Sequence, residues 1–186
     1  MSEFKFTRQN IEYIHDENLA NFGGGDGVRD DSLLTSVLAS PYQECFGKSL
    51  YPDIIAKAVK YLFDFTNYQI FIDGNKRMGL STSTVFLAMN GLKMDLSEDN
   101  QYELVMKIAN GGYKHPNEVI AILRNHIVRT GRGILPETEF EAVTNDTMNN
   151  LQEALKKLAA GPEEDNEVFH ESLNKKTGVQ SPSSTK

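Results

Sequence analysis

Five consecutive residues in the middle of this chain are of types that can bind a phosphate and a metal ion. They run from Asp73 to Arg77 and supply an acid, a glycine, an amide and two cations. The segment that follows, Met78 to Asn90, is apolar and small, and Gly91 closes it, which is typical of a helix. A glycine-containing loop that enters a helix directs free backbone N–H groups and the positive end of the helix dipole toward an anion. The spacing therefore predicts a phosphate-binding loop at a helix N-terminus.

Apolar residues recur at helical spacing along the chain, and glycines separate these segments. This pattern predicts that mainly helices position the loop. Four glycines in residues 22–30 indicate a turn-rich loop, because glycine tolerates backbone angles that other residues avoid. Residues 42–50 combine β-prone aromatic residues with Gly47 and indicate an irregular hairpin. No strand alternates with a helix, so a mostly α-helical single domain is expected. The predicted helices span residues 7–21, 31–40, 52–65, 78–90, 101–110 and 116–129.

The C-terminal part of the chain differs in charge and composition. Residues 137–186 contain ten acidic and five basic side chains, a net charge of −5 out of −7 for the whole chain. Apolar residues from Met148 to Leu158 recur at three- and four-residue steps and predict an amphipathic helix over roughly 138–160. The sequence thus predicts a domain at residues 1–132, a helical extension at 133–160 and a disordered tail at 161–186. Residues 137–186 are expected to be dispensable for the fold and to matter, if at all, for docking.

Bulk composition excludes several classes of protein. The net charge of −7 argues against general nucleic-acid binding, which needs a basic surface. Apolar runs are far shorter than the roughly 18 residues that span a bilayer, so no membrane partner is expected. Cys45 is the only cysteine, which excludes an internal disulfide, and it is expected to be partly buried and unreactive. The N-terminal residues contain no apolar targeting segment, so the expected location is cytoplasmic.

Several motifs in sequence order resemble the Doc branch of the Fic/Doc family. That branch has the signature His-x-Phe-x-Asp-Gly/Ala-Asn-Lys-Arg, and the likeness covers roughly residues 5–130. Widely spaced matches in order are far more specific than a single short motif. The resemblance implies a mainly α-helical Fic/Doc-type bundle with a small β-hairpin flap. The matching motifs are Ile14-His15, Phe22 to Gly24, Gly27 to Asp30, Leu33-Leu34, Ala39 to Pro41, Leu50 to Pro52, Gly74 to Arg77 and Phe86 to Gly91.

The resemblance also implies a role for each residue of the signature, with ATP and Mg²⁺ as the expected cofactors. Asp73 would hold Mg²⁺, a hard cation that suits carboxylate oxygens and substrate phosphates. Gly74 and Asn75 would bring backbone N–H groups and an amide onto phosphate oxygens. Arg77 would form a two-point contact with phosphate. Lys76 stands where adenylyl-transferring Fic proteins have glycine, and in the Doc branch this lysine accompanies phosphoryl transfer.

The predicted hairpin would be the flap that docks a protein target. Its central residues are Cys45, Phe46, Gly47 and Lys48. A flap of this kind aligns a segment of the target by strand addition. The resemblance implies translation machinery as the target class, especially an elongation factor. A separate antitoxin is the expected restraint, because the family's inhibitory string Ser/Thr-x-x-x-Glu-Gly/Asn does not occur in this chain.

Gln69 occupies the position of the family's histidine, which takes the proton from the attacking hydroxyl. General-base assistance contributes roughly 10²–10⁴-fold in rate, and a glutamine amide has no useful basicity near neutral pH. Three explanations stay open: a natural degenerate member, an inactivated variant, or a different base in a reaction that depends mainly on positioning and charge. The leading hypothesis is an impaired Doc-like toxin that binds ATP and modifies a protein hydroxyl. The alternative is a catalytically dead binding module that acts through protein partners.

Two further polar groups are expected to be structural. His15 lies on the first predicted helix, where a hydrogen bond within the fold is favoured over catalysis. The run Ser81-Thr82-Ser83-Thr84 lies just inside the signature helix. Small hydroxyl side chains there favour close helix packing, with contact to nucleotide as the alternative.

Overall fold

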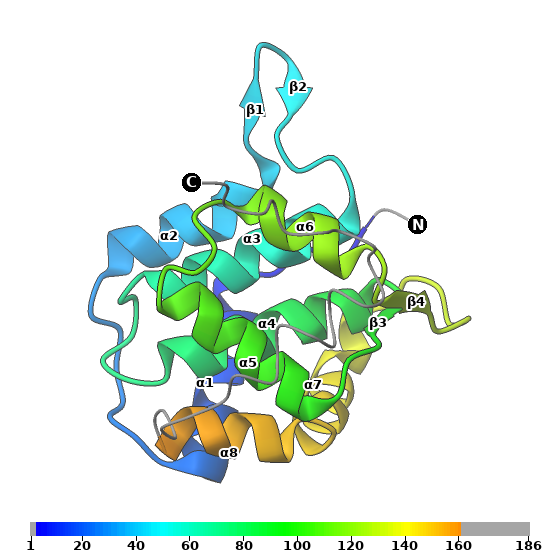
Figure 1. Cartoon of the computed structure of the whole chain (residues 1–186). Helices are drawn as coiled ribbons and strands as arrows, with labels where there is room; N and C mark the ends of the chain where they lie inside the picture. The colour runs from blue at the N-terminus through cyan, green and yellow to red at the C-terminus, as the bar shows by residue number, and fades with distance from the viewer. Residues whose placement is uncertain (1–2, 161–186) are drawn as a thin grey trace, which may run out of the picture.

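The computed structural model describes residues 3–160, and the tail expected to be disordered, residues 161–186, lies outside this range. The described residues form a mainly α-helical bundle (Figure 1). None of their helices is both long enough and apolar enough to cross a membrane. The α-helices are α1 (Arg8–Phe22), α2 (Asp31–Ala39), α3 (Ile54–Asn67), α4 (Asn75–Met89), α5 (Glu98–Ala109), α6 (Pro116–Leu123), α7 (Phe140–Asn149) and α8 (Gln152–Ala160).

Helices α3 and α4 pack along each other at the centre of the bundle, and the other helices surround them (Figure 1). Helix α3 begins where the Asp53 carboxylate accepts a hydrogen bond from the Ala56 N–H at 2.9 Å. The close approach to α4 depends on Gly79. A Cβ atom there would lie 2.9 Å from the Leu62 carbonyl oxygen and closer still to the Thr66 hydroxyl. This contact joins the end of α3 to the start of α4, on either side of the signature loop.

The hydroxyl run of α4 is part of this packing. Ser81, Thr82 and Ser83 are buried, and the Ser83 hydroxyl donates to the Leu80 carbonyl oxygen at 3.0 Å. The Asn18 amide of α1 donates to the Ser81 hydroxyl oxygen at 3.2 Å. These contacts confirm the packing interpretation of the hydroxyl run.

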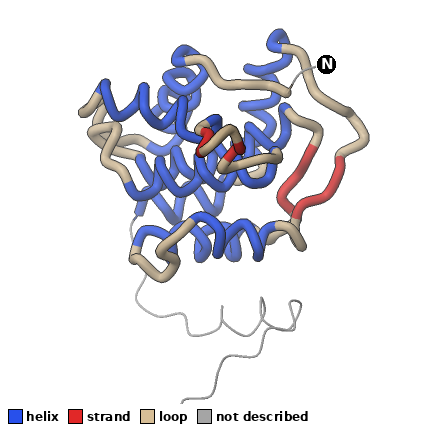
Figure 2. The backbone as a smooth tube through the Cα atoms, turned by 90° about the horizontal axis from the view of Figure 1, so that it is seen from above, coloured by secondary structure: helices blue, strands red, loops and turns tan. Residues whose placement is uncertain are grey.

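The described strands form two small antiparallel pairs (Figure 2). The first joins β1 (Glu44–Cys45) to β2 (Lys48–Ser49) and projects away from the helices (Figure 1). It confirms the expected hairpin and turns through Phe46 and Gly47, which both have positive φ, 51° and 73°. Cys45 lies on its surface and is exposed, so the prediction that it is partly buried is wrong. The hairpin consists of two-residue strands that are exposed throughout, so Cys45 has no apolar core beside it.

The second antiparallel pair corrects the helix predicted over residues 116–129. Helix α6 ends at Leu123, and β4 (Ile127–Arg129) then pairs with β3 (Leu92–Met94), with Lys93 opposite Val128. The two β-branched residues of β4 favour an extended backbone once a partner strand is available. Residues 116–123 kept the predicted helix, which begins with Pro116 at its first position.

The segment predicted as one amphipathic helix forms three elements. These are the 3₁₀ turn η2 (Glu137–Glu139), α7 and α8, with a break between Asn149 and Gln152. A further 3₁₀ turn, η1 (Ser40–Tyr42), follows α2. The apolar faces of α7 and α8 belong to the same buried cluster as α1, α3 and α4. Phe140 is 4% exposed and its ring lies 6.0 Å from that of Phe4. This burial does not agree with the expectation that the segment is dispensable for the fold.

Candidate functional site

The loop between α3 and α4 presents an uncapped helix end. Gly74 stands at the N-cap of α4 with φ of 81°, and no side chain accepts a hydrogen bond from the first turn. The helical ladder starts with the Met78 N–H, which donates to the Gly74 carbonyl oxygen at 2.8 Å. The preceding N–H groups are the donors that a helix N-terminus leaves unsatisfied. This end of α4 can therefore accept an anion.

Asn75 fixes the shape of the loop. Its side-chain oxygen accepts from the Phe71 N–H at 2.9 Å, and its amide nitrogen donates to the Phe71 carbonyl oxygen at 3.0 Å. Phe71 is fully buried and its ring stacks against Phe65 at 6.3 Å. The amide of Asn75 is thus engaged with the backbone, and its predicted contact with phosphate stays a prediction.

His15 of α1 contacts the loop between α3 and α4. Its ring stacks on Phe71 with centroids 4.0 Å apart, and its Nε2 lies 3.2 Å from the Asp73 carbonyl oxygen. A carbonyl only accepts, so Nε2 carries the proton. One ring nitrogen of His15 also lies within 4.8 Å of carboxylate oxygens of Asp16 and Asp26, which are both exposed. The expected structural hydrogen bond of His15 is confirmed.

Arg77 joins the glycine-rich loop to the start of α4. It is 3% exposed, and its Nη1 donates to the carbonyl oxygens of Gly23 at 2.8 Å and Asn18 at 3.2 Å. Its Nη2 lies 3.7 Å from Asp73 Oδ2. Burial lowers the pKa of Arg77 from its ordinary value, and the Asp73 carboxylate opposes this shift. A Cβ atom at Gly24 would overlap the Asp73 carboxylate.

These contacts give Arg77 a structural role that the sequence did not predict. Two of its N–H donors hold backbone carbonyl oxygens, so the predicted two-point contact with phosphate would need donors that remain. The two other charged residues of the signature are more accessible. The Asp73 side chain is 53% exposed, and its Oδ1 accepts from the Gly74 N–H at 2.6 Å. Lys76 is half-buried and forms no ion pair with any residue between 3 and 160.

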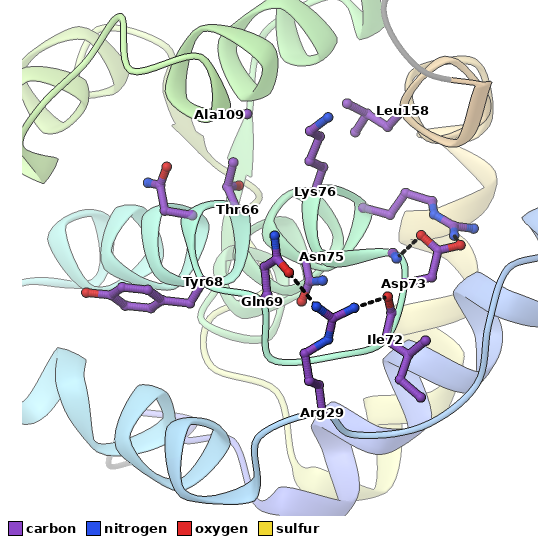
Figure 3. Close-up of a pocket in the computed structure, with 13 residues that line it drawn as sticks. Arg29, Thr66, Tyr68, Gln69, Ile72, Asp73, Asn75, Lys76, Ala109 and Leu158 are labelled. Carbon is purple, nitrogen blue, oxygen red and sulfur yellow. Dashed lines mark hydrogen bonds and ion pairs between the residues drawn. The ribbon is translucent and has the colours of Figure 1, made fainter.

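Arg29 forms a hydrogen bond with Gln69, the residue at the position of the missing base. Arg29 Nη1 donates to Gln69 Oε1 at 2.6 Å, and its Nη2 donates to the Ile72 carbonyl oxygen at 3.2 Å (Figure 3). Sequence reasoning missed this contact, although Arg29 was part of the matching motif Gly27 to Asp30. The residues on either side of the contact are 40 positions apart, so no local pattern could reveal it.

All these groups face one open cavity of about 460 Å³. Its charged lining residues are Arg29, Lys76 and Arg77 against the single carboxylate of Asp73. Leu158 of α8 and Ala109 of α5 complete the wall beside Lys76 (Figure 3). The excess of cations suits an anionic ligand, and the C-terminal helix α8 contributes to the same cavity.

The predicted flap residues lie elsewhere. Cys45, Phe46, Gly47 and Lys48 are all exposed, and none of them lines the cavity. Phe46 at the tip makes no contact that reduces its exposure. The structure thus brings Gln69 and the signature residues together and keeps the hairpin separate from them.

Comparison with known proteins agrees with this geometry. Residues 5–87 match the family model described as Fic/DOC family. "Protein kinase doc" of Escherichia phage P1 is 26% identical to this chain over 81 residues, which are 44% of this chain and 64% of that protein. The match therefore spans less than two thirds of the relative's length. The part of the chain that builds the cavity lies largely within residues 5–87, which are similar to the Fic/Doc family.

Proposed function

We propose that this chain is a Doc-like, toxin-type protein that binds ATP with Mg²⁺ in the cavity at the start of α4. The observation that carries the proposal is the uncapped N-terminus of α4, which faces a cavity lined by three cations and one carboxylate. Unsatisfied N–H groups, the helix dipole and side-chain cations all favour a phosphate at this place. The likeness to "Protein kinase doc" supports a phosphate donor as the ligand.

The residues present fit a nucleotide with a metal ion. Lys76 and the first turn of α4 would contact phosphate oxygens. The exposed carboxylate of Asp73 would hold Mg²⁺, which takes oxygen ligands from carboxylates and phosphates. When bound, the ion would neutralise part of the phosphate charge. Asn75 and His15 would keep the loop in the shape that presents these groups.

We further propose that transfer from the bound nucleotide is weak in this chain. Gln69 has no group that accepts a proton near neutral pH, and its side-chain oxygen already accepts a hydrogen bond from Arg29. Loss of a general base costs roughly 10²–10⁴-fold in rate. The same contact favours the second candidate, a binding module without turnover that acts through protein partners.

The partner would be a protein that presents a hydroxyl to the cavity. The printed name of the phage P1 relative describes it as a protein kinase, which supports a protein acceptor here. The hairpin β1–β2 offers short exposed strands and an exposed phenylalanine for docking a target segment. A translation elongation factor is the proposed target class, and a separate antitoxin is the proposed restraint. A net charge of −7 disfavours nucleic acid as the partner.

Calorimetry with ATP and Mg²⁺ tests nucleotide binding. The chain should bind ATP, and Lys76→Gln should weaken binding about tenfold because one charge-assisted phosphate contact is lost. Lys93→Gln is the matched control, since Lys93 is exposed on β3 and does not line the cavity. No heat at millimolar ATP would contradict the proposal.

A further inference from the structure

We propose that Arg29, held in place by Gln69, is a second phosphate-binding cation that makes the cavity select ligands with more than one phosphoryl group. This inference rests on the proposed function, because it assumes that a phosphate sits at the N-terminus of α4. It gives Gln69 a positive role as a positioning residue for Arg29.

The guanidinium of Arg29 is oriented at two points. Nη1 donates to Gln69 Oε1 at 2.6 Å and Nη2 donates to the Ile72 carbonyl oxygen at 3.2 Å. A guanidinium has five N–H donors, so three remain for a ligand. Both acceptors are neutral oxygens, and neither contact cancels the positive charge. Arg29 is thus oriented by the protein while its charge stays available.

Backbone hydrogen bonds also fix the position of Arg29 relative to the segment before α4. Its N–H donates to the Ile70 carbonyl oxygen at 2.7 Å, and the Ile72 N–H donates to the Gly27 carbonyl oxygen at 3.0 Å. Val28 and Phe71 form an antiparallel bridge between these two bonds. These bonds on both sides of Val28 join the loop of residues 22–30 to the segment before α4, directly next to the Arg29 side chain. A cation fixed in this way loses less conformational entropy when it binds a ligand.

No carboxylate between residues 3 and 160 forms an ion pair with Arg29. The nearest acid in sequence, Asp30, uses its Oδ1 to accept from the Leu33 N–H at 2.9 Å and from the Ser32 hydroxyl at 2.7 Å. The charge of Arg29 is therefore exposed to the cavity that it lines. An uncompensated cation of this kind attracts an anion.

The arrangement of the cations indicates how many phosphoryl groups the ligand carries. Figure 3 shows Arg29 on one side of the cavity and Lys76 on the other, with Gln69 and Asn75 between them in the view. A single phosphate at the N-terminus of α4 would use Lys76 and the free N–H groups. A chain of two or three phosphoryl groups would extend across the cavity and reach Arg29 as well.

The test is the difference in affinity between AMP and ATP, each measured with Mg²⁺ by calorimetry on the full chain. Arg29→Gln should weaken ATP binding about tenfold and change AMP binding by less than about twofold. Arg132→Gln is the matched control, because Arg132 is exposed and does not line the cavity. Melting temperatures of all variants check that the fold is kept.

Variants of Gln69 separate positioning from simple charge. Gln69→Glu should weaken ATP binding as much as Arg29→Gln does, because a carboxylate would neutralise Arg29. Gln69→Ala should have a smaller effect, since the charge remains but is less well oriented. Equal losses for AMP and ATP in Arg29→Gln, or no loss for either, would overturn the inference. Failure of the unaltered chain to bind ATP would overturn the proposed function as well, so the two failures are distinguishable.

Discussion

Replacing Phe140 by alanine should destabilise the whole bundle, although Phe140 lies outside the family match. The ring is 4% exposed and packs against the rings of Phe4, Phe6 and Tyr13, with centroids 6.0, 6.2 and 5.9 Å away. These contacts link α7 to α1 and to the segment that precedes α1. Removing the ring would leave a cavity between three elements.

The size of the effect follows from burial and from how far the neighbours can relax. Phenylalanine-to-alanine substitutions in cores cost roughly 3–5 kcal/mol in free energy of unfolding. Phe4 and Phe6 stand in an irregular segment before α1, which can shift toward the cavity. We therefore expect the lower end, about 3 kcal/mol. Against a total of roughly 5–15 kcal/mol, this is a large fraction.

Urea unfolding followed by circular dichroism measures this change. With a slope of roughly 2 kcal/mol per molar urea, the midpoint should fall by about 1.5 M. Glu141→Ala is the matched control, because Glu141 is the next residue of α7 and is exposed, and it should change stability by less than about 0.5 kcal/mol. A loss below about 1 kcal/mol for Phe140→Ala would refute the conclusion that α7 is part of the core.

Three further predictions concern the C-terminal helices, Gln69 and Asp30. Truncation after Gly133 should lower the melting temperature or prevent folding, because it removes α7 and α8 from the core; an unchanged melting temperature would restore the view that the segment is dispensable. Gln69→His should raise phosphate transfer from labelled ATP by roughly 10²-fold or more, and robust transfer by the Gln69 form would instead indicate another base. Hydrogen bonds from the Leu33 N–H and the Ser32 hydroxyl lower the pKa of Asp30, so its contribution to stability is present at neutral pH and lost as the pH falls below about 4 through the lowered pKa. Urea midpoints of Asp30→Asn and the unaltered chain should therefore differ more at pH 7 than at pH 2.5, and equal differences would contradict that assignment.

Local signals made much of the fold predictable. The helix predicted from residue 7 is α1, and Thr7 is its N-cap, because the Thr7 hydroxyl oxygen accepts from the Asn10 N–H at 3.2 Å. The apolar spacing after Pro52 predicted α3, which begins at Ile54. The signature predicted a helix after the glycine-containing loop, but α4 begins at Asn75, three residues before the expected start at Met78. Such features depend on only a few neighbouring residues.

Long-range contacts account for what the sequence did not predict. Residues 124–129 continue a helical apolar pattern, and only the partner strand β3, more than 30 positions earlier, makes β4 extended. The stripe from Met148 to Leu158 fits either a partner or the protein's own core, and only the packing distinguishes them. At the site, the residue types were correct, but the pairing of Arg29 with Gln69 joins distant segments. The internal contacts of Arg77 also depend on a loop more than 50 positions away.

The central claim is that the first turn of α4 binds phosphate, and amide chemical shifts report it most directly. In a titration of isotope-labelled protein with ATP and Mg²⁺, the backbone amide signals of Asn75, Lys76 and Arg77 should shift most, together with the side-chain signals of Arg29. Signals from the exposed hairpin residue Phe46 serve as the internal reference, since this residue lies outside the cavity. Saturable shifts confined to other parts of the bundle, or no shifts at millimolar ATP, would contradict the account.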